Sequence, residues 1–298
     1  MSDWRPEHAA QVRTAYDVLR AGHDGAPADV LYRHWYAVRP PRQAPPDPWA
    51  APVGSSARAA HDGADAWAPA DSEVVATGVA GVVVVATATG RRALCRGEYV
   101  TTRGRAGFTP RVGDRVRAVA RHGAVVQDGW WRTWGSGWDP RLDHGPLVRV
   151  YLRPAHGESA RLVRAVTGAI DATGEWLLKV AASPEHLTRP DSCVVYLAGP
   201  LRQRTVETVA AAVTGVTAGD PPPLTERFAD GVGWAEDPGT GESFGEVRCA
   251  ALAAAHARLG GRAVTGDAWL TAVADELRRL GIDPAAPHRS ALPVEVAR

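Results

Sequence analysis

Residues 175–196 read EWLLKVAASPEHLTRPDSCVVY, and this stretch decides the fold that we expect. Residues 175–181 and 192–197 are apolar runs rich in β-formers, so we predict a strand over each. Between them lies a turn with Pro184 and Pro190. The first strand carries Lys179, the only lysine among the 34 lysines and arginines of the chain.

Lys179 is our candidate for a catalytic base. An arginine stays protonated in a protein, whereas burial and nearby cations can make a lysine neutral. Because side chains alternate along a strand, Lys179 is expected to share a face with Leu177 and Ala181. A neutral amine near pH 7 is what a general base needs. The alternative is a genome that prefers arginine codons, with one lysine left by chance.

Composition excludes several classes of protein. The chain has 298 residues, 45% of them hydrophobic and 22% charged, which is typical of one large globular domain or two ordinary ones. A net charge of +1 predicts neither a nucleic-acid partner nor a membrane partner. Cys95, Cys193 and Cys249 lie far apart, which argues against a zinc site and a disulfide framework. With no signal-peptide pattern and no apolar run of about 18 residues, we expect a cytoplasmic protein.

Toward the N-terminus we predict two regions before the central one. Residues 1–72 are an N-terminal helical segment and linker, with a helix over 6–21, an aromatic helix or strand over 30–40 and a loop over 38–72. Residues 73–145 are a β-rich subdomain, with a small antiparallel β-barrel or sheet over 73–131. Trp130, Trp131, Trp134 and Trp138 either cover the core of this barrel or line a peptide groove.

Residues 146–298 alternate between strand and helix patterns, which indicates an α+β domain. We predict a strand over 146–153, helices over 157–172, 201–216, 244–260 and 264–281, a helical turn over 224–230, and a loose Pro-rich tail. The complete prediction is an α+β fold with an N-terminal helical segment and a small β-barrel or sheet.

Arginines near the central strands predict an anion site. Arg149 and Arg153 lie on the strand 146–153, Arg189 lies in the turn after Lys179, and Arg248 lies near the start of the helix 244–260. Ser243 and Glu246 fit a capping box, and a helix N-terminus offers free N–H groups to an anion. Together these groups would form a phosphate cradle. Each arginine taken alone is more often a solvated surface charge.

The acid is harder to assign. His144 and His156 flank the strand 146–153 and are our candidates, although each is more often a surface or capping histidine. No metal spacing, nucleophile elbow, P-loop or dinucleotide motif is present. Asp191 either fixes a turn or pairs with Arg189.

Five segments together resemble the HopA type III effector family. They are RVYLRP (149–154), WLLKV (176–180), LTRPDSCVVYL (187–197), PPLTERFADGVGWAEDP (222–238) and ESFGEVR (242–248). The resemblance covers roughly residues 146–258. Actinobacterial members look like the lyase components of class V lanthipeptide and thioamitide biosynthesis.

The resemblance implies a fold like that of phosphothreonine lyases, and their chemistry. Such enzymes remove phosphate from phosphoserine or phosphothreonine by β-elimination after a partner kinase has phosphorylated a precursor peptide, and they use neither a metal nor an organic cofactor. It implies that Lys179 is the base and that Arg189 and Arg248 hold phosphate. The family's Lys-x-His strand reads Tyr151-Leu152-Arg153 here. The acid is therefore His144, His156 or a group other than histidine.

Two other functions stay open. The chain is then either a non-catalytic module that binds the precursor peptide or the kinase, or a secreted effector that acts on host phosphoproteins.

Overall fold

The computed structural model describes fifteen stretches of the chain. They are residues 4–38, 68, 70–87, 90–96, 98–105, 108–118, 121–127, 129–135, 137–138, 144–170, 174–182, 184–198, 202–237, 241–260 and 262–290. The predicted linker over 38–72 lies almost entirely outside them. The fold is α+β, as predicted, and contains two antiparallel sheets.

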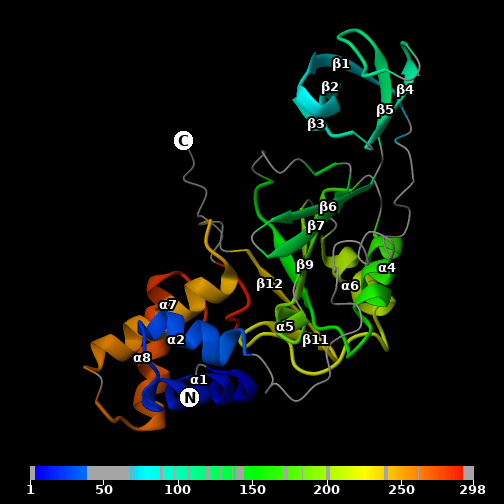
Figure 1. Cartoon of the computed structure of the whole chain (residues 1–298). Coiled ribbons are helices and arrows are strands. Elements are labelled where there is room, and N and C mark those ends of the chain that lie inside the picture. Colours follow the sequence, from blue (N-terminus) through cyan, green and yellow to red (C-terminus); the bar gives the residue numbers. More distant parts are fainter. Residues whose placement is uncertain are drawn as a thin grey trace.

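The larger sheet has seven strands, and two of them come from the stretch around Lys179 (Figure 1). Its strand order is β11-β12-β8-β10-β9-β7-β6, and all of the recorded pairs are antiparallel. The strands are β6 (Arg121–Gln127), β7 (Trp130–Gly135), β8 (Val148–Leu152), β9 (Trp176–Ala181), β10 (Cys193–Leu197), β11 (Glu226–Ala229) and β12 (Val232–Glu236). The predicted strands over 146–153, 175–181 and 192–197 are thus confirmed.

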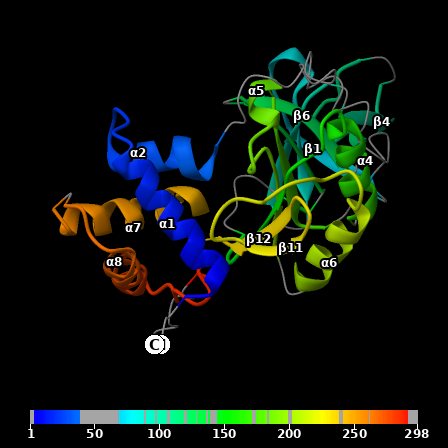
Figure 2. The same ribbon diagram turned by 90° about the horizontal axis from the view of Figure 1, so that it is seen from below.

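Helices cover the two faces of this sheet, as Figures 1 and 2 show. One face packs against α4 (Ser159–Ala169) and α6 (Arg202–Ala212). In α4 the buried residues Leu162, Val163 and Val166 repeat with helical period, so one stripe of the helix meets Leu178 and Val195 of the sheet. The helix α5 (Pro184–Leu187) lies in the turn between β9 and β10.

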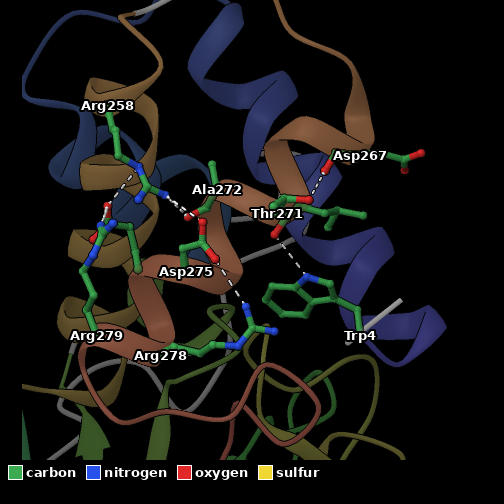
Figure 3. A network of polar contacts seen from close by, with 10 residues as sticks. Trp4, Arg258, Asp267, Thr271, Ala272, Asp275, Arg278 and Arg279 are labelled. Carbon is green, nitrogen blue, oxygen red and sulfur yellow. Dashed lines mark hydrogen bonds and ion pairs between the residues drawn. The ribbon is translucent and has the colours of Figure 1, made fainter. Parts of the chain in front are cut away.

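The other face meets a helical cluster built from both ends of the chain. Its members are α1 (Pro6–Arg20), α2 (Pro27–Leu31), the π-helix η1 (Tyr32–Tyr36), α7 (Phe244–Arg258) and α8 (Gly266–Arg279). Trp269 donates its indole N–H to the carbonyl of Val12 at 2.7 Å. Trp4, which Figure 3 shows, donates to the carbonyl of Leu270 at 3.2 Å. The N-terminal segment is therefore part of the core of the C-terminal helices.

Polar contacts join α7 to α8 at the surface of this cluster (Figure 3). Arg258 donates to the carbonyl of Ala272 at 2.7 Å and lies 3.7 Å from a carboxylate oxygen of Asp275. Arg278 and Arg279 form ion pairs with acidic residues one turn earlier on α8. Because these ion pairs are largely exposed, each adds about 0.5 kcal/mol at most, and the apolar core contributes more to stability.

The smaller sheet has its own core and lies apart from the helices in Figure 1. Its strands, in the order β3-β2-β1-β5-β4, are β3 (Gly90–Leu94), β2 (Val83–Thr87), β1 (Ser72–Thr77), β5 (Arg115–Ala118) and β4 (Tyr99–Arg103), and the short helix η2 (Val79–Gly81) joins β1 to β2. No pairing joins β3 to β4 among the described residues, so the predicted barrel or sheet is an open sheet.

The structure corrects three predictions of local structure. The strands β6 and β7 belong to the larger sheet and not to the small β-unit over 73–131, because β7 pairs with β9. Trp131 is accordingly buried in the core of the larger sheet and covers no barrel. The predicted helical turn over 224–230 is wrong, since residues 226–229 are strand β11.

The third correction concerns the tail. Its residues 282–290 are packed, because Ile282 and His288 are both buried. The predicted capping box is confirmed: Ser243 accepts from the N–H of Glu246 at 3.1 Å, and Glu246 accepts from the N–H of Ser243 at 2.6 Å. The tail therefore contributes to the core, and α7 begins at a defined point beside it.

Candidate functional site

Lys179 lies in the middle of β9, on the face of the sheet that meets the N-terminal helices. Its neighbours across the two adjacent strands are Val194 of β10 and Arg132 of β7. Val194 belongs to the core of the helical cluster, whereas Leu178 and Val180 point the opposite way, into the core beneath α4 and α6. The predicted alternation holds from Leu177 to Val180, whereas Ala181, predicted to share the face of Lys179, is buried in the core beneath α4 and α6. Lys179 itself lies outside that apolar core.

The amine of Lys179 rests on an aromatic ring. Its Nζ is 4.2 Å from the ring centroid of Trp130, the first residue of β7. The side chain is half-buried, and in the described part of the chain it forms no hydrogen bond or ion pair with a carboxylate. The face of the indole ring attracts a cation, so this contact favours the ammonium form of Lys179 and opposes the effects that lower its pKa.

Burial and the arginines around it together lower the pKa of Lys179 to about 8. The largest cause is loss of hydration, followed by repulsion from Arg132 and Arg149; Arg189 acts in the same direction, and Asp191 opposes it. A pKa near 8 leaves a useful fraction of the amine neutral close to physiological pH, as a general base requires.

Arg189 is held beside this amine by the turn that follows α5. Its guanidinium donates to both carboxylate oxygens of Asp191, at 2.8 and 2.6 Å. Its Cζ lies 5.9 Å from the ring centroid of Trp130 and 6.0 Å from that of Tyr32. The predicted pairing with Asp191 is confirmed. A guanidinium held in this fork can receive an anion on its remaining edge.

Arg149 occupies the next strand but one and is more enclosed. It lies opposite Tyr196 in the pairing of β8 with β10, with its Cζ 5.1 Å from the Tyr196 ring. Its Nε donates to Asp237 at 2.6 Å, and its Nη2 donates to the carbonyl of Glu242 at 3.3 Å. Because Asp237 and the carbonyl of Glu242 occupy its Nε and Nη2 groups, Arg149 acts on Lys179 through its charge more than it offers free donors.

Tyrosines form the wall between the cations and the helical cluster. Tyr32 and Tyr36 lie one turn apart in η1, with ring centroids 5.5 Å apart. Tyr36 is buried and hydrogen-bonded to the hydroxyl of Tyr151 on β8. Gly245 of α7 faces the Tyr36 ring so closely that a Cβ would overlap it. This packing fixes η1 against the sheet and holds Tyr32 next to Arg189.

Arg248 lies beneath α7 and not on the open side of this group. Its side chain is fully buried and donates to the carbonyls of Pro287 and Arg289, at 2.7 and 2.9 Å. Burial lowers the pKa of Arg248 to about 10. In this structure it joins the tail to α7, so the predicted phosphate contact would require the tail to move.

The other predicted residues are not brought to Lys179 by any recorded contact. Arg153 follows β8 and packs over Gly219. His156 is exposed in the turn before α4, the helix that packs on the opposite face of the sheet. His144 stacks on Trp138, with ring centroids 3.9 Å apart. The structure thus groups Lys179 with Arg189 and Arg149, without either candidate histidine.

Sequence reasoning did not place Arg132, Trp130 or Tyr32 at the site of Lys179. The first two could have been found, because alternation along WWRTWG places both on one face of a strand and pairing with β9 makes that face the one of Lys179. Tyr32 carried no such signal, since it reaches the site from a segment far away in the sequence.

Two cavities lie elsewhere in the described residues, between α1, β11 and the tail. Their volumes are about 480 and 560 Å³, and both are lined by Arg5, Glu226 and Arg227. The described residues contain no group of His, Cys, Asp or Glu side chains that could hold a metal ion. None of their helices is long and apolar enough for a membrane span.

Residues 126–289 match the HopA1 effector protein family, and this range is more than half of the chain. The chain belongs to that family. The match includes β7 to β12 and α4 to α8, and hence Lys179, Arg132 and Arg189, whereas Tyr32 lies outside it.

Solved structures show the same fold. The effector protein from Pseudomonas syringae pv. tomato strain DC3000 is similar with a TM-score of 0.55 and 13% identity, over 97% of this chain and 100% of that one. The effector protein from Pseudomonas syringae pv. syringae strain 61 has a TM-score of 0.55 and 12% identity, over 96% and 98%. No curated protein matches the sequence.

Proposed function

We propose that this HopA1-family protein is a phosphoserine/phosphothreonine lyase. In this proposal it acts in the cytoplasm on a precursor peptide that a partner kinase has phosphorylated, and it forms dehydroalanine or dehydrobutyrine in lanthipeptide-type biosynthesis. The observation that supports the proposal most is the placement of Lys179, a half-buried amine with no carboxylate partner among the described residues, beside Arg132 and Arg189.

The proposed reaction is a β-elimination. The neutral amine of Lys179 takes the Cα proton of the phosphorylated residue, and the electron pair of that C–H bond becomes the Cα–Cβ double bond. The Cβ–O bond breaks, and its electron pair leaves with the phosphate. No water is consumed, so the products are a dehydrated residue and inorganic phosphate.

The charges around Lys179 suit this reaction in two ways. Burial and the neighbouring cations lower the pKa of the base to about 8, so a large fraction of the amine is neutral near pH 8 and can accept a proton. The same cations attract a phosphate dianion, and guanidinium donors stabilise the charge that grows on the leaving group in the transition state. One cluster of positive charge therefore serves both the base and the substrate.

Co-expression with the precursor peptide and the kinase tests the proposal. The wild-type protein should convert the phosphopeptide into a dehydrated peptide, which is 98 Da lighter for each phosphate lost as phosphoric acid, and Lys179→Met should accumulate phosphopeptide. A dehydrated peptide formed by Lys179→Met at the wild-type rate would remove Lys179 from the mechanism.

The alternative is a non-catalytic module that binds the peptide or the kinase in the same complex. The specific observation in its favour is that neither candidate histidine contacts Lys179: His144 stacks on Trp138, and His156 is exposed before α4. Purified protein that binds the phosphopeptide and never releases phosphate would support this alternative. Elimination from a generic phosphoprotein, with none from a precursor peptide, would instead support an effector that acts on phosphoproteins.

A further inference from the structure

We propose that Tyr32 is the proton donor to the leaving phosphate in this site. The inference rests on the proposed lyase function and identifies its missing acid. It assigns a catalytic role to the N-terminal segment, which lies outside the residues that match the family.

Tyr32 and Lys179 both lie near the guanidinium of Arg189. The Cζ of Arg189 is 6.0 Å from the Tyr32 ring centroid, and its charge acts on the Tyr32 hydroxyl. Arg189 in turn lies 5.9 Å from the ring of Trp130, and the amine of Lys179 lies 4.2 Å from that ring. A phosphate held by Arg189 would therefore have both the amine and the phenol near it, as an elimination with a base and an acid requires.

The backbone holds Tyr32 in place. Tyr32 opens a π-helix, a form that is rare and is frequently found at functional sites. Tyr36, one turn later, is locked by its contact with Gly245 and by its hydrogen bond to Tyr151. Because Tyr32 stacks on the fixed ring of Tyr36, its hydroxyl is also held in one position beside Arg189.

Other candidate donors in the described residues are less suitable. His144 is stacked on Trp138, and His156 is exposed before α4. The hydroxyl of Tyr151 is buried and already bonded to Tyr36, and the Tyr196 ring faces Arg149. Tyr32 is the half-buried phenol that contacts Arg189 directly.

The pKa values of the two groups suit their roles. Burial, with the nearby charge of Asp191, raises the pKa of Tyr32 to about 12, while the pKa of Lys179 is lowered to about 8. Between these values the base is neutral and the acid still carries its proton. A histidine with its usual pKa of about 6.5 would be mostly deprotonated wherever Lys179 is neutral.

The proton balance of the step is complete. The Cα proton goes to Nζ of Lys179, the Cβ–O bond breaks, and the bridging oxygen of the phosphate takes the phenolic proton of Tyr32. The phenolate that remains lies beside Arg189 and regains a proton from solvent, while Lys179 releases one.

The first experiment measures elimination by the purified full-length chain from a synthetic phosphothreonine peptide. Tyr32→Phe should lower kcat by roughly 100- to 10,000-fold, the usual effect of a general acid, with KM changed less than about threefold. Tyr16→Phe is the matched control, because it removes another hydrogen-bonded hydroxyl of the N-terminal segment. That hydroxyl donates to the carbonyl of Arg262 and accepts from the N–H of Val264. This control should retain the wild-type kcat.

A second substrate separates proton donation from positioning. In an S-phosphocysteine peptide the leaving thiophosphate is a weaker base and needs less help from an acid. The loss caused by Tyr32→Phe should therefore be at least tenfold smaller on this peptide than on phosphothreonine. An equal loss on both peptides, or an unchanged kcat on phosphothreonine, would overturn the role of Tyr32.

The same measurements distinguish a failure of the lyase proposal from a failure of the Tyr32 assignment. A wild-type chain that eliminates nothing from either peptide overturns the lyase proposal and the acid together. A wild-type chain that eliminates, with Tyr32→Phe equally active, overturns only the assignment of Tyr32.

Discussion

The two faces of the seven-stranded sheet carry opposite chemistry, although the same strands build both. The face beneath α4 and α6 is continuous and apolar, with Trp131, Leu178 and Val195 fully buried. The face toward η1 and α7 carries Arg132, Lys179 and Arg149 among aromatic rings. One face thus contributes stability alone. The other also packs Tyr151 and Val194 into a hydrophobic core, but it accepts a stability cost for its cationic site. Substitutions of neighbouring residues can separate the two contributions.

The largest expected effect is that of Lys179→Met. Elimination should fall by roughly 100- to 10,000-fold, because the base is lost. The free energy of unfolding should stay level or rise, because a half-buried cation among other cations disappears. Mass spectrometry of the peptide and urea unfolding measure the two quantities. Lys179→Arg is the matched control: it keeps the charge, cannot become neutral, and should be as inactive.

Leu178→Ala tests the other face at the adjacent position. The fully buried side chain leaves a cavity, so the free energy of unfolding should fall by about 2–5 kcal/mol. At a temperature where the variant is folded, kcat should stay within about twofold of the wild-type value. Unfolding in urea and rates on the phosphopeptide give both numbers. A kcat lowered as far as in Lys179→Met would mean that the faces are not independent.

Arg132→Gln sharpens the electrostatic part of the comparison. The neutral form of Lys179 is the active one, so kcat should rise with pH through about 8 in the wild-type chain. Removing the repulsion from Arg132 should raise the pKa of Lys179. The rise of kcat with pH should therefore move to higher pH by about one unit. The rate at pH 7 should therefore drop up to about tenfold and approach the wild-type rate above about pH 9.5. If kcat rises at the same pH as in the wild-type chain, Arg132 does not affect the pKa of the base.

The smallest effect is expected for His156→Ala. This side chain is exposed in the turn before α4, the helix that packs on the apolar face of the sheet. The value of kcat should therefore change less than about twofold, and the free energy of unfolding should change by less than about 0.5 kcal/mol. His144→Ala, which removes a ring stacked on Trp138, should also keep its kcat. A loss of kcat of more than about tenfold in either variant would show that the histidine, and not Tyr32, is the acid.

Local patterns predicted the elements whose partners are close in the sequence. Ser243 and Glu246 marked the start of α7, and alternation around Lys179 marked β9. Patterns failed where distant pairing decides, because Trp131 joins the larger sheet only through β9 and residues 226–229 become a strand only through β12. Propensity cannot report such contacts.

The site shows the same limit. Lys179 and Arg189 are ten residues apart and were predicted as a pair. Tyr32 reaches them through the packing of η1 against Tyr151 and Gly245, which no window of sequence contains. Arg248 was assigned by its place near a helix start, but burial beneath the tail outweighs that place.

The hydrogen bond from Trp4 to Leu270 joins positions that are 266 residues apart. Closing a loop of this length costs about 5 kcal/mol of chain entropy, and folds dominated by such distant contacts form slowly. A nascent chain on the ribosome therefore cannot dock its first helix until α8 has emerged. Because that docking brings Tyr32 to Arg189, the proposed site would be completed only at the end of synthesis, so an unfinished chain would release no phosphate.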